Sequence, residues 1–98
     1  NNKIIGILLF SRYENVLCFL AVDPDYRRNH AAQEMFYYML NFMQPNNDIS
    51  VTTYREGVPE GIAARKFYKK MGFTETELTE EFGAPVQVFI LKRQKTPT

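Results

Sequence analysis

Residues 20–40 read LAVDPDYRRNHAAQEMFYYML, and this stretch decides the fold. An apolar strand ends at residue 22, a turn containing Pro24 follows, and an amphipathic helix begins after Arg27 and Arg28. The unpaired amides at a helix N-terminus point toward a bound anion, and the helix dipole favours negative charge there. The stretch therefore predicts a phosphate-binding turn between a strand and a helix.

We expect the helix to run over residues 29–43, because Asn29 suits the N-cap position and Pro45 stops the pattern. At 100° per residue its apolar side chains share one broad face, and its polar and tyrosine side chains share the other. Core packing is the favoured interpretation of the Met and Phe stripe. The apolar face comprises Ala31, Ala32, Met35, Phe36, Met39, Leu40, Phe42 and Met43.

Working outward, the remaining apolar and β-branched segments are typical of strands. Residues 16–22 are almost wholly apolar, which predicts a strand that is covered on both faces. A helix links this strand to the next one, so we expect a parallel pair with a right-handed crossover. The expected fold class is a mixed α/β, or α+β, sheet with helices on its faces. Its strands are expected at 4–10, 16–22, 49–55, 74–81 and 86–91.

A second helix is expected over residues 62–71, with Gly72 as a left-handed stop and Phe73 packing back on the last turn. The pattern places Tyr68 at the border between its apolar and basic faces. The basic face is most often simply solvated. The apolar face comprises Ala63, Ala64, Phe67 and Met71, and the basic face comprises Arg65, Lys66, Lys69 and Lys70.

Length and composition predict one globular domain over residues 1–98, with a frayed tail at 93–98. The net charge of +1 gives no whole-chain argument for binding nucleic acid or a membrane surface. Cys18 is the single cysteine, so no internal disulfide forms, which fits a cytoplasmic protein. In the middle of an apolar strand its thiol is expected to be inert packing.

Two loops follow the expected parallel strands, and in open α/β sheets ligands bind beyond the carboxyl ends of the strands. We therefore expect residues 27–32, 56–61 and the start of the second helix to surround one cleft. The alternative for 27–32 is a solvated basic turn that caps an ordinary helix. Tyr68 is a further candidate, and its alternative is a half-buried core tyrosine. His30 is the only histidine, and no metal site or nucleotide-binding fingerprint is found.

Together these motifs resemble the GCN5-related N-acetyltransferase (GNAT) superfamily. Its strand–turn–helix motif, Q/R-x-x-G-x-G/A, matches Arg27-Arg28-Asn29-His30-Ala31-Ala32. Its second motif, A-x-x-F/L-Y-x-K-x-G-F, matches the residues from Ala64 to Phe73, which read ARKFYKKMGF. The resemblance covers essentially the whole chain, which looks like the C-terminal two-thirds of a typical member. It implies a mainly antiparallel sheet with a central parallel pair and an absent N-terminal strand and helices.

The resemblance also implies acetyl-CoA as the acetyl donor, with no metal. Backbone groups of Leu20, Ala21 and Val22 would pair with the pantetheine arm, and amides at this strand end would form an oxyanion hole. Tyr68 matches the family's general acid, which protonates the leaving CoA thiolate. The general base would be Glu56 or Glu60 in the loop. The pyrophosphate would be held by Arg27, Arg28, Asn29, His30, Ala31 and Ala32.

Three features depart from the family pattern. His30 replaces the first motif glycine and places a Cβ where the backbone normally approaches phosphate. Gly61 stands where many members carry an asparagine that helps to hold the cofactor or the acceptor. A carboxylate base often lies on one of the family's two splayed strands, but here those strands carry Cys18 and Thr52 at the plausible positions. The first departure is expected to weaken binding of acetyl-CoA, and the other two bear on the catalytic assignment.

The leading hypothesis is an N-acetyltransferase that moves acetyl from acetyl-CoA to a primary amine by direct attack in a ternary complex. The alternative is a non-catalytic module for acyl-CoA sensing or protein association. Expected partners are a small-molecule or peptide amine and a second copy of the chain, whose exposed front strand favours self-association. Nucleic acid and membrane are not expected.

Overall fold

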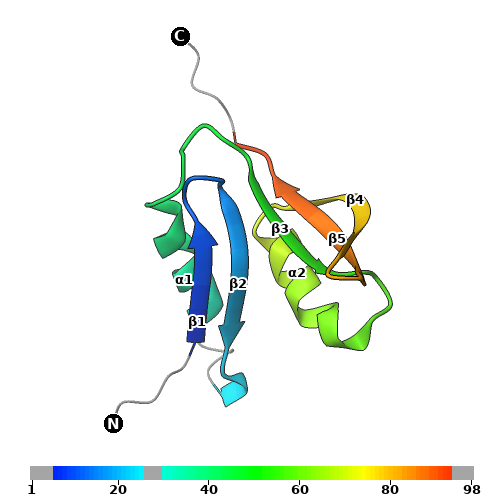
Figure 1. The fold of residues 1–98 in the computed structure, drawn as a ribbon. Helices are drawn as coiled ribbons and strands as arrows, with labels where there is room; N and C mark the ends of the chain where they lie inside the picture. The colour runs from blue at the N-terminus through cyan, green and yellow to red at the C-terminus, as the bar shows by residue number, and fades with distance from the viewer. Residues whose placement is uncertain (1–5, 26–29, 94–98) are drawn as a thin grey trace. The chain divides into compact units, whose positions relative to one another are not determined.

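The computed structural model describes residues 6–25 and 30–93. The chain divides into two compact units, residues 1–45 and 46–98, whose positions relative to one another are not determined (Figure 1). The first unit contains β1 (Gly6–Ser11), β2 (Val16–Val22) and α1 (Ala31–Leu40). The second contains β3 (Ile49–Tyr54), the short 3₁₀ helix η2 (Pro59–Gly61), α2 (Ile62–Lys70), β4 (Thr74–Glu81) and β5 (Ala84–Leu91).

In the first unit, β1 and β2 form an antiparallel hairpin that α1 contacts (Figure 1). The hairpin turn is fastened to the segment after α1 by Asn15, which is buried and has a positive φ of 56°. Its side-chain amide donates to the Gln44 carbonyl at 3.0 Å, and its side-chain oxygen accepts from the Gln44 N–H at 2.8 Å. This paired bond fixes the turn because each buried polar atom has a partner.

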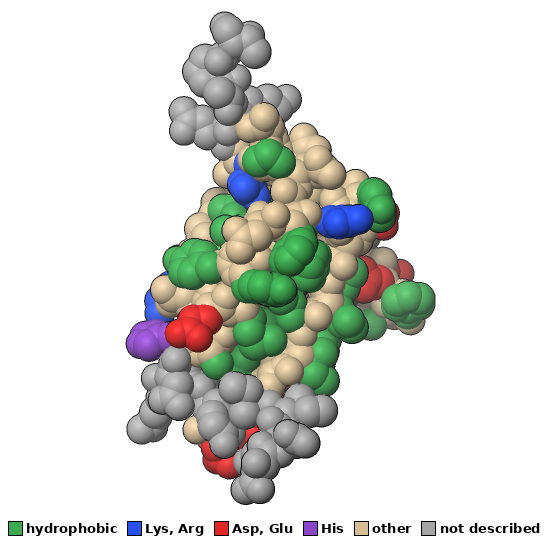
Figure 2. Space-filling model, turned by 90° about the vertical axis from the view of Figure 1, so that its left-hand side faces the viewer, with side chains coloured by type: hydrophobic (Ala, Val, Ile, Leu, Met, Phe, Trp, Pro, Cys, Tyr) green, Lys and Arg blue, Asp and Glu red, His purple; other side chains and the backbone are tan. Residues whose placement is uncertain are grey.

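The expected amphipathic pattern is confirmed over α1, whereas Phe42, expected on the apolar face, lies beyond the helix and is exposed. Phe36 and Met39 are almost fully buried, whereas Tyr37 and Tyr38 are about half exposed; hydrophobic side chains at the molecular surface are visible in Figure 2. The helix is shorter than the expected 29–43, because after Leu40 the backbone changes to three-residue turns such as Asn41 N–H to the Tyr38 carbonyl. The expected N-cap at residue 29 lies outside the described residues.

The expectation that β2 is covered on both faces is wrong, and so is the expectation that Cys18 is buried. Leu17 is buried, but Cys18 and Phe19 are exposed. The register shows the reason: Leu9 pairs with Phe19 and Phe10 pairs with Leu17, so Cys18 is the extra residue of a β-bulge. Two residues of β2 then oppose one of β1, which breaks the in–out alternation of the strand.

In the second unit, β5 pairs antiparallel with both β3 and β4. Residues 82 and 83, with φ of 52° and 81°, form the turn between β4 and β5, and such paired positive values are typical of a type I′ hairpin. All eight residues of β4 are exposed. The strand β5 begins at Ala84, two residues before the expected start, because this turn sets Ala84 opposite Glu81.

A complete Schellman motif ends α2, as expected from Gly72. The Gly72 N–H donates to the Lys69 carbonyl at 3.1 Å, and the Phe73 N–H donates to the Tyr68 carbonyl at 2.9 Å. Gly72 adopts a φ of 101°, which glycine reaches without strain. Phe73 is buried, and its ring centroid lies 5.6 Å from that of Tyr68.

The expected division of α2 into an apolar and a basic face is wrong. The buried side chains of α2 are those of Arg65 and Tyr68, whereas Ala63 is exposed. The physical reason is that the guanidinium of Arg65 finds polar partners beneath the helix, so that its burial is compensated. Lys66 and Lys70 remain exposed, as expected.

The expected fold class is confirmed as a mainly antiparallel α/β architecture, with five strands and two α-helices among the described residues. Strand positions agree with expectation to within two residues at each described end. Of the expected tail at 93–98, residues 94–98 lie outside the described residues, and the Arg93 N–H donates to Asp48 Oδ1 at 2.9 Å. The organisation of 1–98 as one domain stays a prediction.

Candidate functional site

The residues expected to contact the pantetheine arm are the last three of β2. Leu20 and Ala21 are half-buried and Val22 is buried; in β1 they pair with Leu8, Ile7 and Gly6, respectively. The bulge at Cys18 lies two residues before Leu20 and bends the strand there. Bulges are over-represented next to active sites, where they redirect a strand.

The expected phosphate-binding turn is described from His30 onward, and Arg27, Arg28 and Asn29 lie outside the described residues. His30 is exposed, occupies the N-cap of α1 with φ 60° and ψ 24°, and makes no side-chain cap hydrogen bond to a described residue. This is the left-handed conformation that glycine favours. The substitution of the motif glycine by His30 therefore keeps the backbone shape of a glycine position.

The first turn of α1 supplies the amides that an anion would meet. The first helical hydrogen bond runs from the Glu34 N–H to the His30 carbonyl at 3.0 Å. The N–H groups of Ala31, Ala32 and Gln33 precede that bond and so have no carbonyl partner within the helix. Ala31 and Ala32 carry only a methyl side chain, so neither places a long side chain over these amides.

Tyr68 is a buried aromatic residue on α2, only 5% exposed. Its ring lies 5.9 Å from Phe67, 5.6 Å from Phe73 and 6.0 Å from Phe89, measured between centroids. Burial raises the pKa of the Tyr68 phenol above its ordinary value, because the charged phenolate would lose hydration. A phenol is protonated at neutral pH in any case, and burial disfavours its ionised form further.

The two carboxylates proposed as bases differ in their surroundings. Glu56 and Glu60 are both exposed, but only Glu56 lines an open pocket of about 140 Å³ beside α2. Glu60 lies in η2. The lining residues of this pocket are Glu56, Gly57, Val58, Ile62, Arg65, Lys66 and Lys69, and Tyr68 does not belong to them.

Gly61, the second departure from the family pattern, has a steric explanation. It is buried against Tyr54, and a Cβ built at Gly61 would overlap the Tyr54 Cβ and lie 3.0 Å from its Cγ. An asparagine at this position would displace the Tyr54 side chain or the helix start. In this chain the packing of Tyr54 against the beginning of α2 leaves no room for an asparagine at position 61.

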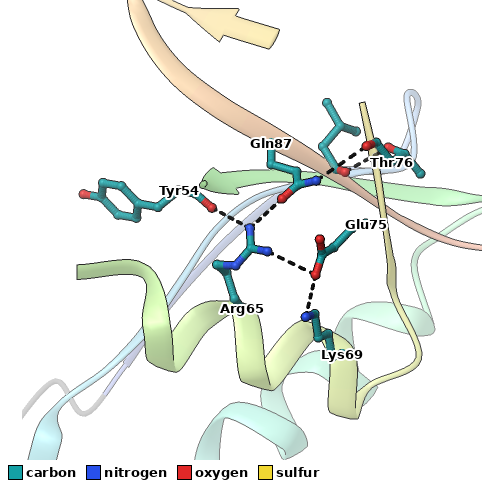
Figure 3. Close-up of polar contacts among 7 residues, drawn as sticks. Tyr54, Arg65, Lys69, Glu75, Thr76 and Gln87 are labelled. Carbon is teal, nitrogen blue, oxygen red and sulfur yellow. Dashed lines mark hydrogen bonds and ion pairs between the residues drawn. The ribbon is translucent and has the colours of Figure 1, made fainter. Parts of the chain in front are cut away.

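Sequence reasoning missed a buried polar cluster around Arg65 (Figure 3). The Arg65 guanidinium donates to the Tyr54 carbonyl at 2.9 Å and to Gln87 Oε1 at 2.7 Å, and its Nη2 lies 3.1 Å from Glu75 Oε1. Lys69 pairs with the same Glu75 oxygen. The available signal was Gln87, a polar side chain inside the apolar strand VQVFIL, which marks a buried partner.

The hydrogen bond from Lys69 is the largest influence on Glu75 and lowers the pKa of its carboxyl below the ordinary value, with Arg65 adding to the effect.

Among the described residues no group of three His, Cys, Asp or Glu side chains is placed to hold a metal ion. No helix in the described part of the chain is long and apolar enough to cross a membrane.

The described residues combine mainly antiparallel strands with a helix that begins at a glycine-like N-cap and a helix that carries a buried tyrosine. The family model described as "Acetyltransferase (GNAT) domain" matches residues 1–85. The chain belongs to this GNAT acetyltransferase family. No curated protein matches it.

Solved structures show the same fold at low sequence identity. An N-acetyltransferase from Staphylococcus aureus Mu50 is 21% identical with a TM-score of 0.62, and the match covers 76% of this chain and 38% of that one. Ard1 from Thermoplasma volcanium is 18% identical with a TM-score of 0.68, over 88% of this chain and 61% of that one. A Bacteroides thetaiotaomicron protein described as a GNAT-family acetyltransferase is 16% identical with a TM-score of 0.66, over 93% and 56%. The chain thus spans between 38% and 61% of the length of these proteins.

Proposed function

We propose that this chain transfers an acetyl group from acetyl-CoA to a primary amine by direct attack in a ternary complex. The observation that carries the proposal is the burial of Tyr68, the residue that the sequence motif matches to the family's general acid; burial also raises the pKa of its phenol. The GNAT family membership supports acetyl transfer in general, and the amine acceptor is part of the proposal.

In the proposed reaction the neutral amine attacks the thioester carbonyl carbon, and the carbonyl π electrons move to oxygen. The resulting oxyanion is held by backbone amides at the end of β2, near Leu20, Ala21 and Val22. When the intermediate collapses, the carbon–sulfur bond breaks and the thiolate accepts the Tyr68 proton. The attacking nitrogen loses its proton to a base, for which Glu56 is favoured over Glu60 because it lines a pocket.

A phenol whose pKa is raised still suits this task. Desolvation raises the basicity of a thiolate formed beside it as well, so the proton remains transferable in the buried setting. The pyrophosphate of the donor would contact the amides at the start of α1, with Arg27 and Arg28 supplying charge. The proposal includes both classes of amine acceptor, a small molecule and a peptide.

The experiment is calorimetric titration with acetyl-CoA, followed by detection of free CoA thiol with a panel of primary amines. We expect saturable binding of acetyl-CoA and thiol release that requires one class of amine. No heat of binding at millimolar acetyl-CoA would overturn the proposal for this chain. A test variant for the phosphate-binding turn is the double change Arg27→Ala and Arg28→Ala. It should weaken binding of acetyl-CoA and leave the melting temperature near that of the wild type.

A non-catalytic acyl-CoA-sensing or protein-association module is the second candidate. The histidine at the first motif glycine and the glycine at the family's asparagine position favour it. This candidate predicts acetyl-CoA binding without acetylation of any amine in the panel. It also predicts that Tyr68→Phe changes no measurable reaction.

A further inference from the structure

Arg65 occupies a place where a cation is costly. It is 6% exposed, and its guanidinium carbon lies 5.0 Å from the centroid of the fully buried Phe89 ring. A buried charge persists only when it is paired and hydrogen-bonded, since removal from water is unfavourable. The contacts of Arg65 supply that pairing, and their directions determine how the residue holds α2.

Those contacts reach all three strands of the second unit (Figure 3). Nη1 donates to the carbonyl of Tyr54, the last residue of β3, and to Gln87 on β5, while Nη2 faces Glu75 on β4. A planar guanidinium holds several acceptors in fixed directions, which the single point charge of a lysine does not. The contacts of Arg65 therefore fix how α2 is rotated about its own axis and how far it is shifted along that axis, relative to β3, β5 and β4.

Tyr68 follows Arg65 by three residues, so the two side chains project from the same side of α2. Both contact Phe89: the guanidinium lies over its ring, and the Tyr68 ring lies 6.0 Å from it, centroid to centroid. The polar cluster thus borders directly on the aromatic group that surrounds Tyr68. A shift of α2 after loss of the Arg65 contacts would move the phenol together with the helix.

We infer that Arg65 is a positioning residue that fixes the Tyr68 phenol for proton transfer, through its contacts with β3, β5 and β4 and the shared Phe89 ring. The inference rests on the proposed function of Tyr68 as general acid. A misplacement of about 1 Å costs a catalytic group on the order of 100-fold in rate. We therefore expect Arg65→Met to lower kcat by about 10-fold or more and to leave the KM for acetyl-CoA within about 3-fold.

A double-mutant cycle separates positioning from general loss of structure. Arg65→Met is measured in the wild-type chain and in the Tyr68→Phe chain, with kcat as the readout. Positioning predicts a loss of kcat with Tyr68 present and no further loss when the phenol is absent, because residues that act as a unit are non-additive. An equal loss in both backgrounds, or no loss in either, would overturn the inference. Ala63→Gln, at an exposed position of the same helix outside the motif from Ala64 to Phe73, is the control and should leave kcat unchanged.

A second variant covers the case in which Arg65→Met does not fold. Arg65→Lys keeps the charge facing Glu75 but lacks the planar fork for the Tyr54 carbonyl and Gln87. The same cycle with Arg65→Lys should show the same non-additivity with a smaller loss. Full wild-type kcat in Arg65→Lys would show that charge alone suffices and would contradict positioning by the fork.

An NMR readout keeps this inference distinct from the proposed reaction. The Tyr68 ring, surrounded by the rings of Phe67, Phe73 and Phe89, should have resonances shifted from random-coil values in tyrosine-labelled protein. Arg65→Met or Arg65→Lys should move those resonances, and the control Ala63→Gln should not. Unmoved Tyr68 resonances in the Arg65 variants refute the inference, whereas absence of acetyl transfer in the wild-type chain refutes the proposed function.

Discussion

Replacement of His30 by glycine should stabilise the protein. His30 holds a φ of 60° at the N-cap of α1, is exposed and makes no side-chain cap hydrogen bond to a described residue. The imidazole therefore contributes no cap bond within the described chain, while its Cβ is crowded by the left-handed backbone. Glycine adopts the same φ without that crowding.

The magnitude follows from two opposing contributions. The left-handed conformation costs a residue with a Cβ about 1–2 kcal/mol. Glycine loses more backbone entropy on folding than histidine, which reduces the gain in stability by about 0.5–1 kcal/mol. The net stabilisation is about 0.5–1 kcal/mol, and for a chain of this length it corresponds to a rise of about 2–8 °C in melting temperature.

Thermal and urea unfolding followed by circular dichroism give the required free energies. His30→Ala keeps the Cβ and should show no gain, and Gln33→Gly, at a helical position of α1, should lose about 1 kcal/mol. A His30→Gly chain no more stable than His30→Ala would refute the reasoning from backbone strain. If this turn binds phosphate, His30→Gly should also bind acetyl-CoA more tightly in calorimetry.

Three further predictions concern the second unit. Gly61→Asn should destabilise by about 1–3 kcal/mol, because its side chain overlaps Tyr54, and an unchanged urea midpoint would contradict that packing. Glu75 has a lowered pKa in the folded state because of Lys69, so its contribution is present above its unfolded pKa and is lost as pH falls through the folded pKa. The stability difference between wild type and Glu75→Gln should therefore shrink below about pH 4, and a pH-independent difference would exclude this linkage. Phe82→Asn should raise stability by about 1 kcal/mol, because Phe82 is fully exposed at a φ of 52° and asparagine suits the first position of a type I′ turn; a lower melting temperature would refute it.

The sequence contained enough information for the elements that depend on local patterns. The stripe that includes Phe36 and Met39 has a helical period, so the buried face of α1 was predictable. Gly72 followed by Phe73 has a direct meaning at a helix end, and the Schellman motif confirmed it. The family motifs were likewise readable, because they place chemically distinct residues at fixed spacing on those elements.

Features that depend on contacts between distant residues were not predictable in the same way. Arg65 looks like part of a solvated basic face until Gln87 and Glu75, 22 and 10 residues later, are placed beside it. The exposure of Cys18 depends on a bulge, which is set by strand register and leaves no compositional mark. The steric restriction to glycine at position 61 likewise comes from its contact with Tyr54, which sequence patterns do not reveal.

Steady-state acetyl transfer by the wild type and by Tyr68→Phe tests the central claim most directly. Phenylalanine preserves the ring that packs on Phe73 and Phe89 and removes only the hydroxyl, so the fold should be retained. General acids contribute about 100-fold to 10,000-fold, and we predict a fall in kcat within that range with acetyl-CoA affinity unchanged. An unchanged kcat in Tyr68→Phe would contradict the assignment of Tyr68 as the proton donor.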